Sequence, residues 1–311
     1  MAGSARSEQP GGPAPTAATT TATAHGSAAA HGSASARVAV VGGSGTIGAK
    51  LVRLLEADGH EVVVASPSTG VDTVTGEGLE KALRGADIVV DASKPRSFAP
   101  EVLEDFFTTG IRHLLDAERS AGVRHHLSLS IVGADRAPDV PFYRAKAGME
   151  QIVRDGGIPW TILHATQFFE FARGIAAASE RTEHTERTDE PDGTSPAVLL
   201  PAIQVQPIAG DAVAAHLARL VARLLGADGT DATDGVTAPL GGDLEIAGPD
   251  RMSLAAFVRS ALGAGSPTLR ESPRAPYFGG LISANTLLPG PSARLIGPSL
   301  SEWTSTDRGV C

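Results

Sequence analysis

Apolar side chains along this chain change their spacing at regular intervals, from short unbroken runs to a recurrence at every third or fourth residue. The first run, residues 38–41, is apolar and mostly β-branched, which suits a strand buried on both faces. After it, Ile47, Leu51, Leu54 and Leu55 fall on one stripe of a helix. The pattern therefore predicts a strand, a turn and an amphipathic helix.

The same alternation continues through the first half of the chain. Pro100 and Pro141 suit the first turns of helices, and Gly122 suits a helix end. Strands that alternate with helices predict a parallel sheet with right-handed crossovers, so the expected fold class is α/β, a doubly wound parallel sheet of the Rossmann type. The predicted strands are 61–65, 87–91, 127–132 and 159–163, and the predicted helices are 78–84, 100–122 and 141–153.

The order is less regular beyond Phe171. Two polar stretches, residues 179–195 and 226–242, are rich in residues that favour turns, and they predict mobile loops. Between them, residues 211–225 carry the apolar stripe of a helix. Residues 244–250 predict a short strand that ends in a turn, and Ser253 predicts the cap of the helix that follows.

Composition divides the chain into three parts. Residues 1–36 consist mainly of Ala, Thr, Ser, Gly and Pro, and they lack the apolar segment of a signal peptide, so they predict a disordered extension. Residues 37–175 form the predicted sheet core. Residues 176–311 predict a smaller, less regular C-terminal region that interleaves with the core and covers the carboxyl edge of the sheet.

Charge and cysteine content exclude several classes of function. The net charge is −9 and no cluster of Lys and Arg is present, which argues against nucleic acid as a partner. No apolar run approaches the roughly 20 residues of a membrane span. The single cysteine, Cys311, excludes an internal disulfide and a cysteine-ligated metal site, so we expect a cytoplasmic protein without a metal. The adjacent His125 and His126 would point to opposite faces of a strand.

Three glycines separate the first predicted strand from its helix in the pattern G-x-x-G-x-x-G. Gly42 allows a tight turn, Gly45 lets the backbone approach a pyrophosphate, and Gly48 lets the helix pack close to the strand. The helix N-terminus adds free N–H groups and a partial positive charge. Together these features predict a dinucleotide site.

The residues that end the second strand bear on the choice of dinucleotide. An acid there would accept a hydrogen bond from a ribose 2′-hydroxyl and repel a 2′-phosphate. Residues 65–69 contain neither an acid nor an Arg, whereas Ser66, Ser68 and Thr69 could donate to a phosphate. We expect NADP, with NAD as the alternative; a plain Ser/Pro turn explains the same residues.

Five motifs together resemble the atypical short-chain dehydrogenase/reductases, specifically the NmrA-like NAD(P)H-binding group. The similarity spans roughly residues 37 to 305, and the group contains both reductases and proteins that only sense the dinucleotide. The motifs are the glycine turn, GADIVVD at 85–91, LSIVGAD at 129–135, YRAK at 143–146 and TQFFEF at 166–171. The cofactor contacts expected are Gly42, Ser44, Gly45, Thr46, Ile47, Gly48, Ser66, Ser93, Lys146 and Thr166.

The resemblance also implies catalytic residues. Lys146 matches the helix lysine that reaches the nicotinamide ribose, with a solvated helix lysine as the alternative. Ser130 matches the catalytic serine, although Ser128 faces the same side of the strand, and either hydroxyl could instead satisfy local backbone. The family tyrosine lies four residues before the lysine, where this chain has Phe142. Tyr143 lies one residue later, so its side chain is turned by about 100° around the helix from the expected direction. It is a candidate proton donor, with a packing or surface residue as the alternative.

The segment after Leu163 is expected to lie against the nicotinamide and to shape a substrate pocket. The pocket residues expected are His164, Gln167, Phe168 and Phe169. His164 could relay protons, because its ordinary pKa is near neutral, or it could be structural. The phenylalanines, together with Phe171, predict an apolar cavity for hydrophobic or aromatic substrates.

The sequence thus predicts an NADP-dependent oxidoreductase that moves hydride between NADPH and a small apolar carbonyl compound, quinone or enone. A small molecule is then its partner. The alternative is a non-catalytic NAD(P)H sensor that binds a protein, which Phe142 favours. An isomerase or epimerase is a third possibility that no residue singles out. The sequence leaves the substrate and the oligomeric state open.

Overall fold

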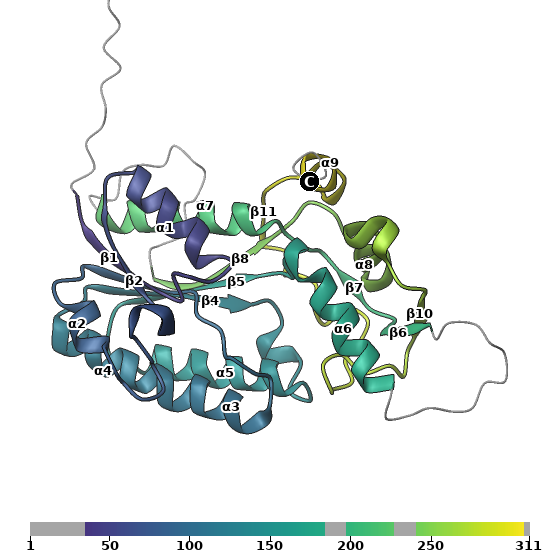
Figure 1. Cartoon of the computed structure of the whole chain (residues 1–311), viewed down its shortest axis with the longest axis horizontal. Coiled ribbons are helices and arrows are strands. Elements are labelled where there is room, and N and C mark those ends of the chain that lie inside the picture. Colours follow the sequence, from purple (N-terminus) through teal and green to yellow (C-terminus); the bar gives the residue numbers. More distant parts are fainter. Residues whose placement is uncertain (1–34, 184–196, 227–240, 308–311) are drawn as a thin grey trace, which may run out of the picture. The chain divides into compact units, whose positions relative to one another are not determined.

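The computed structural model describes residues 35–183, 197–226 and 241–307. Its main feature is a parallel sheet of seven strands in the order β11-β8-β5-β4-β3-β1-β2 (Figure 1). Strand order reverses beside β1, which confirms the doubly wound sheet predicted from the sequence. The strands are β1 Arg37–Val41, β2 Glu61–Ala65, β3 Ile88–Asp91, β4 His125–Ile131, β5 Trp160–Ala165, β8 Gly242–Ala247 and β11 Arg294–Leu295.

Helices cover both faces of this sheet (Figure 1). Val38 and Val40 of β1 point toward α1 and α7, whereas Ala39 and Val41 point toward the helices on the other face. Because side chains alternate along a strand, the apolar run of β1 serves both layers at once. The helices are α1 Gly48–Ala57 and α7 Gly210–Leu225 on the first face, and α2 Leu79–Leu83, α3 Pro100–Glu104, α4 Ile111–Ala121 and α5 Pro141–Arg154 on the second.

The helix predicted over residues 100–122 is continuous but not uniform. Between α3 and α4, the segment η2 Asp105–Gly110 has the wider π-helical turn. Pro100 begins the helix and Gly122 ends it with a φ of 73°, as the sequence predicts. Among the described residues, no helix is both long enough and apolar enough to cross a membrane.

Two details of the sequence prediction are wrong. Leu54 is 37% exposed, and Val52 lies with Leu51 and Leu55 on the buried face of α1. Residues 179–183 continue the helix α6 Ala172–Glu183, and residue 242 begins β8, so both predicted loops are shorter than expected. The rest of these loops, residues 1–34 of the predicted extension over residues 1–36, and Cys311 lie outside the described residues.

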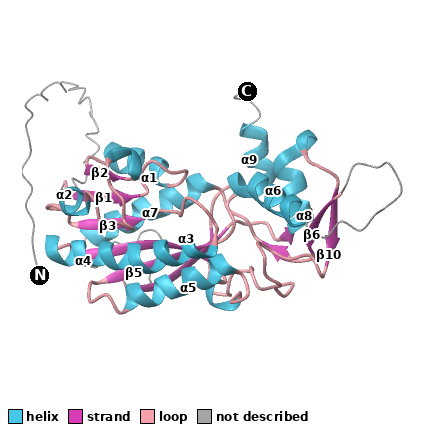
Figure 2. Cartoon of the chain, turned by 60° about the horizontal axis from the view of Figure 1, so that its bottom comes forward, coloured by secondary structure: helices cyan, strands magenta, loops and turns pink. Residues whose placement is uncertain are grey.

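The C-terminal part of the chain contributes to two layers. It supplies β8 and β11 to the main sheet and α7 to one of the layers that cover it, and it also forms a second core in which Leu200, Phe257 and Val258 are buried. Ser253 caps α8, since its side chain accepts a hydrogen bond from the N–H of Ala256 at 3.2 Å. The division at residue 175 stays a prediction. The second core (Figure 2) contains α6, β6 Val198–Pro201, β7 Gln204–Val205, β9 Met252–Ser253, α8 Leu254–Leu262, β10 Leu269–Ser272 and α9 Leu300–Asp307.

Candidate functional site

The glycine turn between β1 and α1 is held by backbone contacts. Gly42 has a φ of 77°, and a Cβ there would lie 2.6 Å from the Cα of Ser93. A Cβ on Gly48 would lie 2.2 Å from the carbonyl oxygen of Gly42. A Cβ on Gly45 would approach only that same carbonyl oxygen, at 3.1 Å. Gly42 and Gly48 thus close the turn, and Gly45 leaves its outer side open.

A cavity of about 400 Å³, which we call the turn pocket, opens above this turn at the carboxyl ends of β1, β3, β4 and β5. It is lined by every predicted cofactor residue except Gly48, which lies behind the turn. Contact of these residues with a cofactor stays a prediction. The residues that line it are Gly42, Ser44, Gly45, Thr46, Ile47, Ser66, Ser93, Lys146 and Thr166.

The turn pocket fits a dinucleotide. Thr166 Oγ1 and Gln167 Oε1 are buried there without a hydrogen-bond partner among the described residues. Buried polar atoms cost free energy unless a partner satisfies them, so these two atoms are suited to a polar ligand. Helix α1 begins at Gly48, three residues after Gly45, so its free N–H groups and partial positive charge lie next to the turn and suit a pyrophosphate.

Lys146 lies on α5 at the edge of the turn pocket, with only 6% of its surface exposed. Its ammonium donates a hydrogen bond to the carbonyl oxygen of Leu129 at 2.8 Å and lies 5.0 Å from the ring centroid of Phe107. Burial lowers the pKa of Lys146, and the carboxylates of Asp91 and Glu150 offset part of that effect. The interpretation of Lys146 as a solvated helix lysine is therefore wrong.

Tyr143 and Phe142 both line the turn pocket. The phenol of Tyr143 is buried, accepts a hydrogen bond from Gln167 Nε2 at 3.3 Å and also bonds to Tyr277. Burial raises the pKa of Tyr143 to about 12, which opposes the release of its proton near neutral pH. Surface exposure, one of the alternatives for Tyr143, is excluded.

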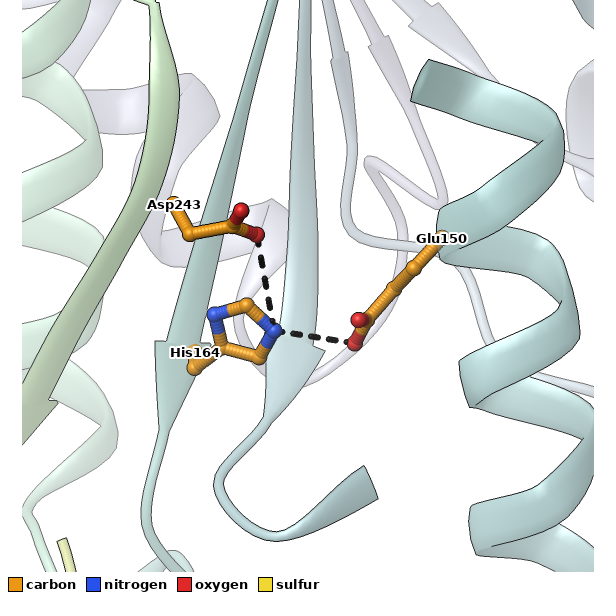
Figure 3. Close-up of side chains that lie close together, drawn as sticks. All are labelled: Glu150, His164 and Asp243. Atoms are coloured by element: carbon orange, nitrogen blue, oxygen red, sulfur yellow. Dashed lines mark hydrogen bonds and ion pairs between the residues drawn. The ribbon is translucent and has the colours of Figure 1, made fainter. Parts of the chain in front are cut away.

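Ser130 and His164 meet at one carboxylate, that of Glu150 on α5. Ser130 Oγ donates to Glu150 Oε1 at 2.5 Å, and His164 Nε2 lies 3.0 Å from the same oxygen. On its other side, His164 Nδ1 lies 3.3 Å from the carbonyl oxygen of Leu244. Figure 3 shows the imidazole between Glu150 and Asp243, whose Oδ1 lies 4.0 Å from Nε2. Neither candidate serine bonds to local backbone, since Ser128 Oγ has no partner among the described residues.

Two of the four predicted substrate residues lie elsewhere. His164 lines a second cavity, not the turn pocket, because the side chains of β5 alternate and only its neighbour Ala165 faces the pocket. Phe169 is buried in the second core, with its ring 5.4 Å from that of Trp303. Gln167 and Phe168 do line the turn pocket.

Sequence reasoning missed most of the aromatic wall of the turn pocket. Phe278 packs on Phe171 with ring planes 17° apart. Within the described part of the chain, Phe278 is the one residue other than glycine that has a positive φ, 48°. No local pattern marks Phe278, whereas Lys94 and Arg96 could have been noticed directly after the third strand. The wall comprises Phe98, Phe106, Phe142, Phe168, Phe171, Tyr277 and Phe278.

Comparisons with known proteins agree with this geometry. Residues 42–195 match the model of a family described as NAD(P)H-binding. The chain is 31% identical over 148 residues to the photosystem II assembly factor Ycf39 of Synechocystis sp., covering 43% of this chain and 45% of that protein. It is 30% identical over 159 residues to the (4-alkanoyl-5-oxo-2,5-dihydrofuran-3-yl)methyl phosphate reductase of Streptomyces griseus, covering 45% of this chain and 52% of that one.

The matched region thus spans about half the length of these relatives. A solved structure, the UDP-glucose 4-epimerase of Thermus thermophilus in complex with NAD, superimposes with a TM-score of 0.60. It shares 18% identity and covers 88% of this chain and all of its own. At this identity the likeness establishes the fold alone.

Proposed function

We propose that this chain, whose residues 42–195 match an NAD(P)H-binding family, is an NADP-dependent oxidoreductase of the short-chain dehydrogenase/reductase type. Its reaction moves hydride between NADPH and a small apolar carbonyl compound, quinone or enone. When bound, the dinucleotide supplies the hydride, and the protein orients it and excludes water. We place this enzyme in the cytoplasm, in keeping with its single cysteine.

The observation that carries the proposal is that one cavity combines a dinucleotide cradle with an aromatic wall. The glycine turn and Lys146 line one part of the turn pocket, and Phe98, Phe171 and Phe278 line another. Aromatic side chains offer apolar faces on which a flat conjugated molecule can stack. In this proposal a substrate held there lies beside the nicotinamide, and Lys146 holds the nicotinamide ribose.

Residues around the second strand support NADP as the cofactor. Ser66 lines the turn pocket and follows β2 directly, so no carboxylate stands at the strand end to repel a 2′-phosphate. The one nearby acid in the lining, Asp72, has its carboxylate engaged by the backbone N–H of Val74 at 2.8 Å. Lys94 and Arg96 add positive charge to the lining.

The relatives support two different functions. The Streptomyces griseus relative is named as a reductase, which favours the enzyme. The Synechocystis relative is named as an assembly factor, which favours a non-catalytic protein that responds to NAD(P)H and binds a protein partner. Phe142 at the expected tyrosine position is the observation in this chain that favours this second candidate.

One assay distinguishes the two candidate functions. Purified protein is mixed with NADPH and a panel of quinones, enones and aldehydes, and NADPH absorbance is followed. We expect oxidation with at least one compound of the panel. In the Lys146→Met variant we expect the dissociation constant for NADPH to rise about tenfold, a loss of about 1.4 kcal/mol. The matched control Lys81→Met, on exposed α2 surface, should bind NADPH like the wild type.

Tight NADPH binding without oxidation of NADPH anywhere on the panel would contradict the enzyme. If, in addition, a co-purifying protein partner is released by NADPH, the second candidate is the correct one.

A further inference from the structure

A chain of hydrogen bonds crosses from the turn pocket to a second cavity. Ser130 lines the turn pocket, and His164 lines the second cavity. Glu150 lies between them, with 5% of its side chain exposed, and its Oε1 is 2.5 Å from Ser130 Oγ and 3.0 Å from His164 Nε2. The two ends of this chain therefore face different compartments, and its middle is buried.

The second cavity is large and charged. Its volume is about 840 Å³, and His164 is 16% exposed toward it. Arg154 fixes the carboxylates at its wall, since it bonds to Glu150 Oε2 at 3.2 Å and to Asp243 Oδ1 at 2.7 Å. Asp243 is 47% exposed, so the imidazole lies between a buried carboxylate and one in contact with solvent.

The surroundings of His164 favour the imidazolium. Both ring nitrogens face acceptors, a carboxylate at Nε2 and a backbone carbonyl at Nδ1, and only the doubly protonated ring can donate to both. Burial lowers the pKa of His164, but the carboxylates of Glu150 and Asp243 and the carbonyl of Leu244 together more than offset this, and the net shift is upward. The charged and titratable groups facing His164 or its cavity are Glu150 and Arg154 of α5, Asp243 and Glu245 of β8, Asp135, Arg136, His216 and Arg294.

We propose that Ser130, Glu150 and His164 form a proton relay that carries protons from the second cavity to the product of hydride transfer. The proposal rests on the oxidoreductase function proposed above. It names a proton source for the reaction that does not require the buried phenol of Tyr143 or a tyrosine at position 142.

In the proposed relay, each proton moves one residue closer to the turn pocket. The hydride brings its electron pair to the carbon of the substrate, and the π electrons of the C=O bond move to oxygen. His164 Nε2 gives its proton to the carboxylate of Glu150, and Glu150 gives this proton to Ser130 Oγ. Ser130, whose hydroxyl turns from Glu150 to the substrate, gives its own proton to that substrate oxygen. Water in the second cavity returns a proton to His164. One hydride and one proton are thus consumed for each carbonyl reduced.

A first test needs no turnover. Imidazole NMR of the protein without cofactor follows the titration of His164. We expect a pKa above the ordinary value of about 6.5 in the wild type and a fall in this pKa in Glu150→Gln, because the amide cannot stabilise the imidazolium as a carboxylate does. If His164 titrates at the same pH in both proteins, the pairing on which the relay depends is absent and the proposal fails.

The second test uses the active protein. In the wild type, kcat should fall as pH rises through the pKa of His164, because the relay loses its proton. His164→Gln and Ser130→Ala should each lower kcat about 100-fold, the usual scale of general acid catalysis, and abolish this pH dependence, while the dissociation constant for NADPH stays within about twofold. The control His125→Gln, on β4 but bonded to Thr161 away from the relay, should behave like the wild type.

The outcomes separate the two proposals. A wild type that oxidises NADPH, with the same rate and pH profile in His164→Gln and Ser130→Ala, contradicts the relay alone. A wild type that reduces no compound contradicts the proposed function. The relay is then contradicted too, because it has no reaction to serve, even if the NMR titration confirms the His164–Glu150 pair.

Discussion

Gly42 and Gly48 lie against backbone atoms that leave no room for a methyl group, whereas Gly45 faces open space on its outer side. The sequence predicts all three as parts of one motif, because the strand before them and the helix after them are marked locally. Which glycine serves the turn and which serves a ligand follows only from the backbone path. The structure therefore assigns Gly42 and Gly48 to the turn and leaves Gly45 for a ligand, and substitutions can separate these two functions.

Gly48→Ala should destabilise the protein by about 1–3 kcal/mol or more, because its Cβ would collide with the carbonyl oxygen of Gly42. Gly45→Ala should cost less stability, because its Cβ would lie 3.1 Å from that oxygen and near no other atom. It should instead weaken NADPH binding at least tenfold, about 1.4 kcal/mol, by placing a methyl group where the pyrophosphate approaches. Urea denaturation measures the first effect, and a fluorescence titration with NADPH measures the second. Wild-type affinity in Gly45→Ala would remove this glycine from the site.

At the scale of elements, the sequence predicts what local signals determine. Pro100, Gly122 and Pro141 mark helix ends through their own backbone chemistry, and these ends are confirmed. The π-helical segment at residues 105–110 was not predicted, because no residue pattern marks this wider turn as Pro and Gly mark helix ends. The prediction that Leu54 faces the core was also wrong, since Val52 packs against the core in its place.

Helix α4 and strand β4 are joined by a buried pair, Glu118 and His126, neither of which is exposed. Burial lowers the pKa of His126, but the carboxylate of Glu118, 2.8 Å away, raises it together with that of Asp91, and the net shift is upward. The sequence showed only that His125 and His126 face opposite ways. The partner of His126 comes from the preceding helix, and the pairing could not be inferred from spacing alone.

Glu118→Gln should lower the free energy of unfolding by about 2 kcal/mol at mildly acidic pH, because a hydrogen bond to a charged group is lost. A raised pKa in the folded state stabilises the fold below the unfolded value, about 6.5, and this stabilisation is lost as pH rises through the folded pKa. The variant should therefore differ from the wild type less at alkaline pH. Urea unfolding across pH measures this, with exposed Glu80→Gln as the control. An equal deficit at every pH would contradict a charged His126.

At the scale of the whole molecule, the site depends on residues that the sequence separates widely. The turn pocket joins the glycine turn to Phe98, Phe171 and Phe278, and the second cavity exists because β8 pairs with β5 across a long intervening segment. Strand β8 was predicted, but its place between β5 and β11 was not. His164 was consequently expected beside the nicotinamide, although β5 directs its side chain to the cavity beside β8.

Dinucleotide binding should stabilise the described fold as a unit, because the turn pocket draws on β1, β3, β4, β5 and the loop that carries Phe278. A ligand that binds only the folded state adds about 2.7 kcal/mol at a hundredfold excess over its dissociation constant, which for a chain of this size raises Tm by roughly 5–10 °C. At equal concentration NADPH should raise Tm more than NADH, because no acid ends β2 to repel the 2′-phosphate. Differential scanning fluorimetry with both dinucleotides decides this. A larger shift with NADH would overturn NADP as the cofactor and leave the glycine turn as a site for NAD.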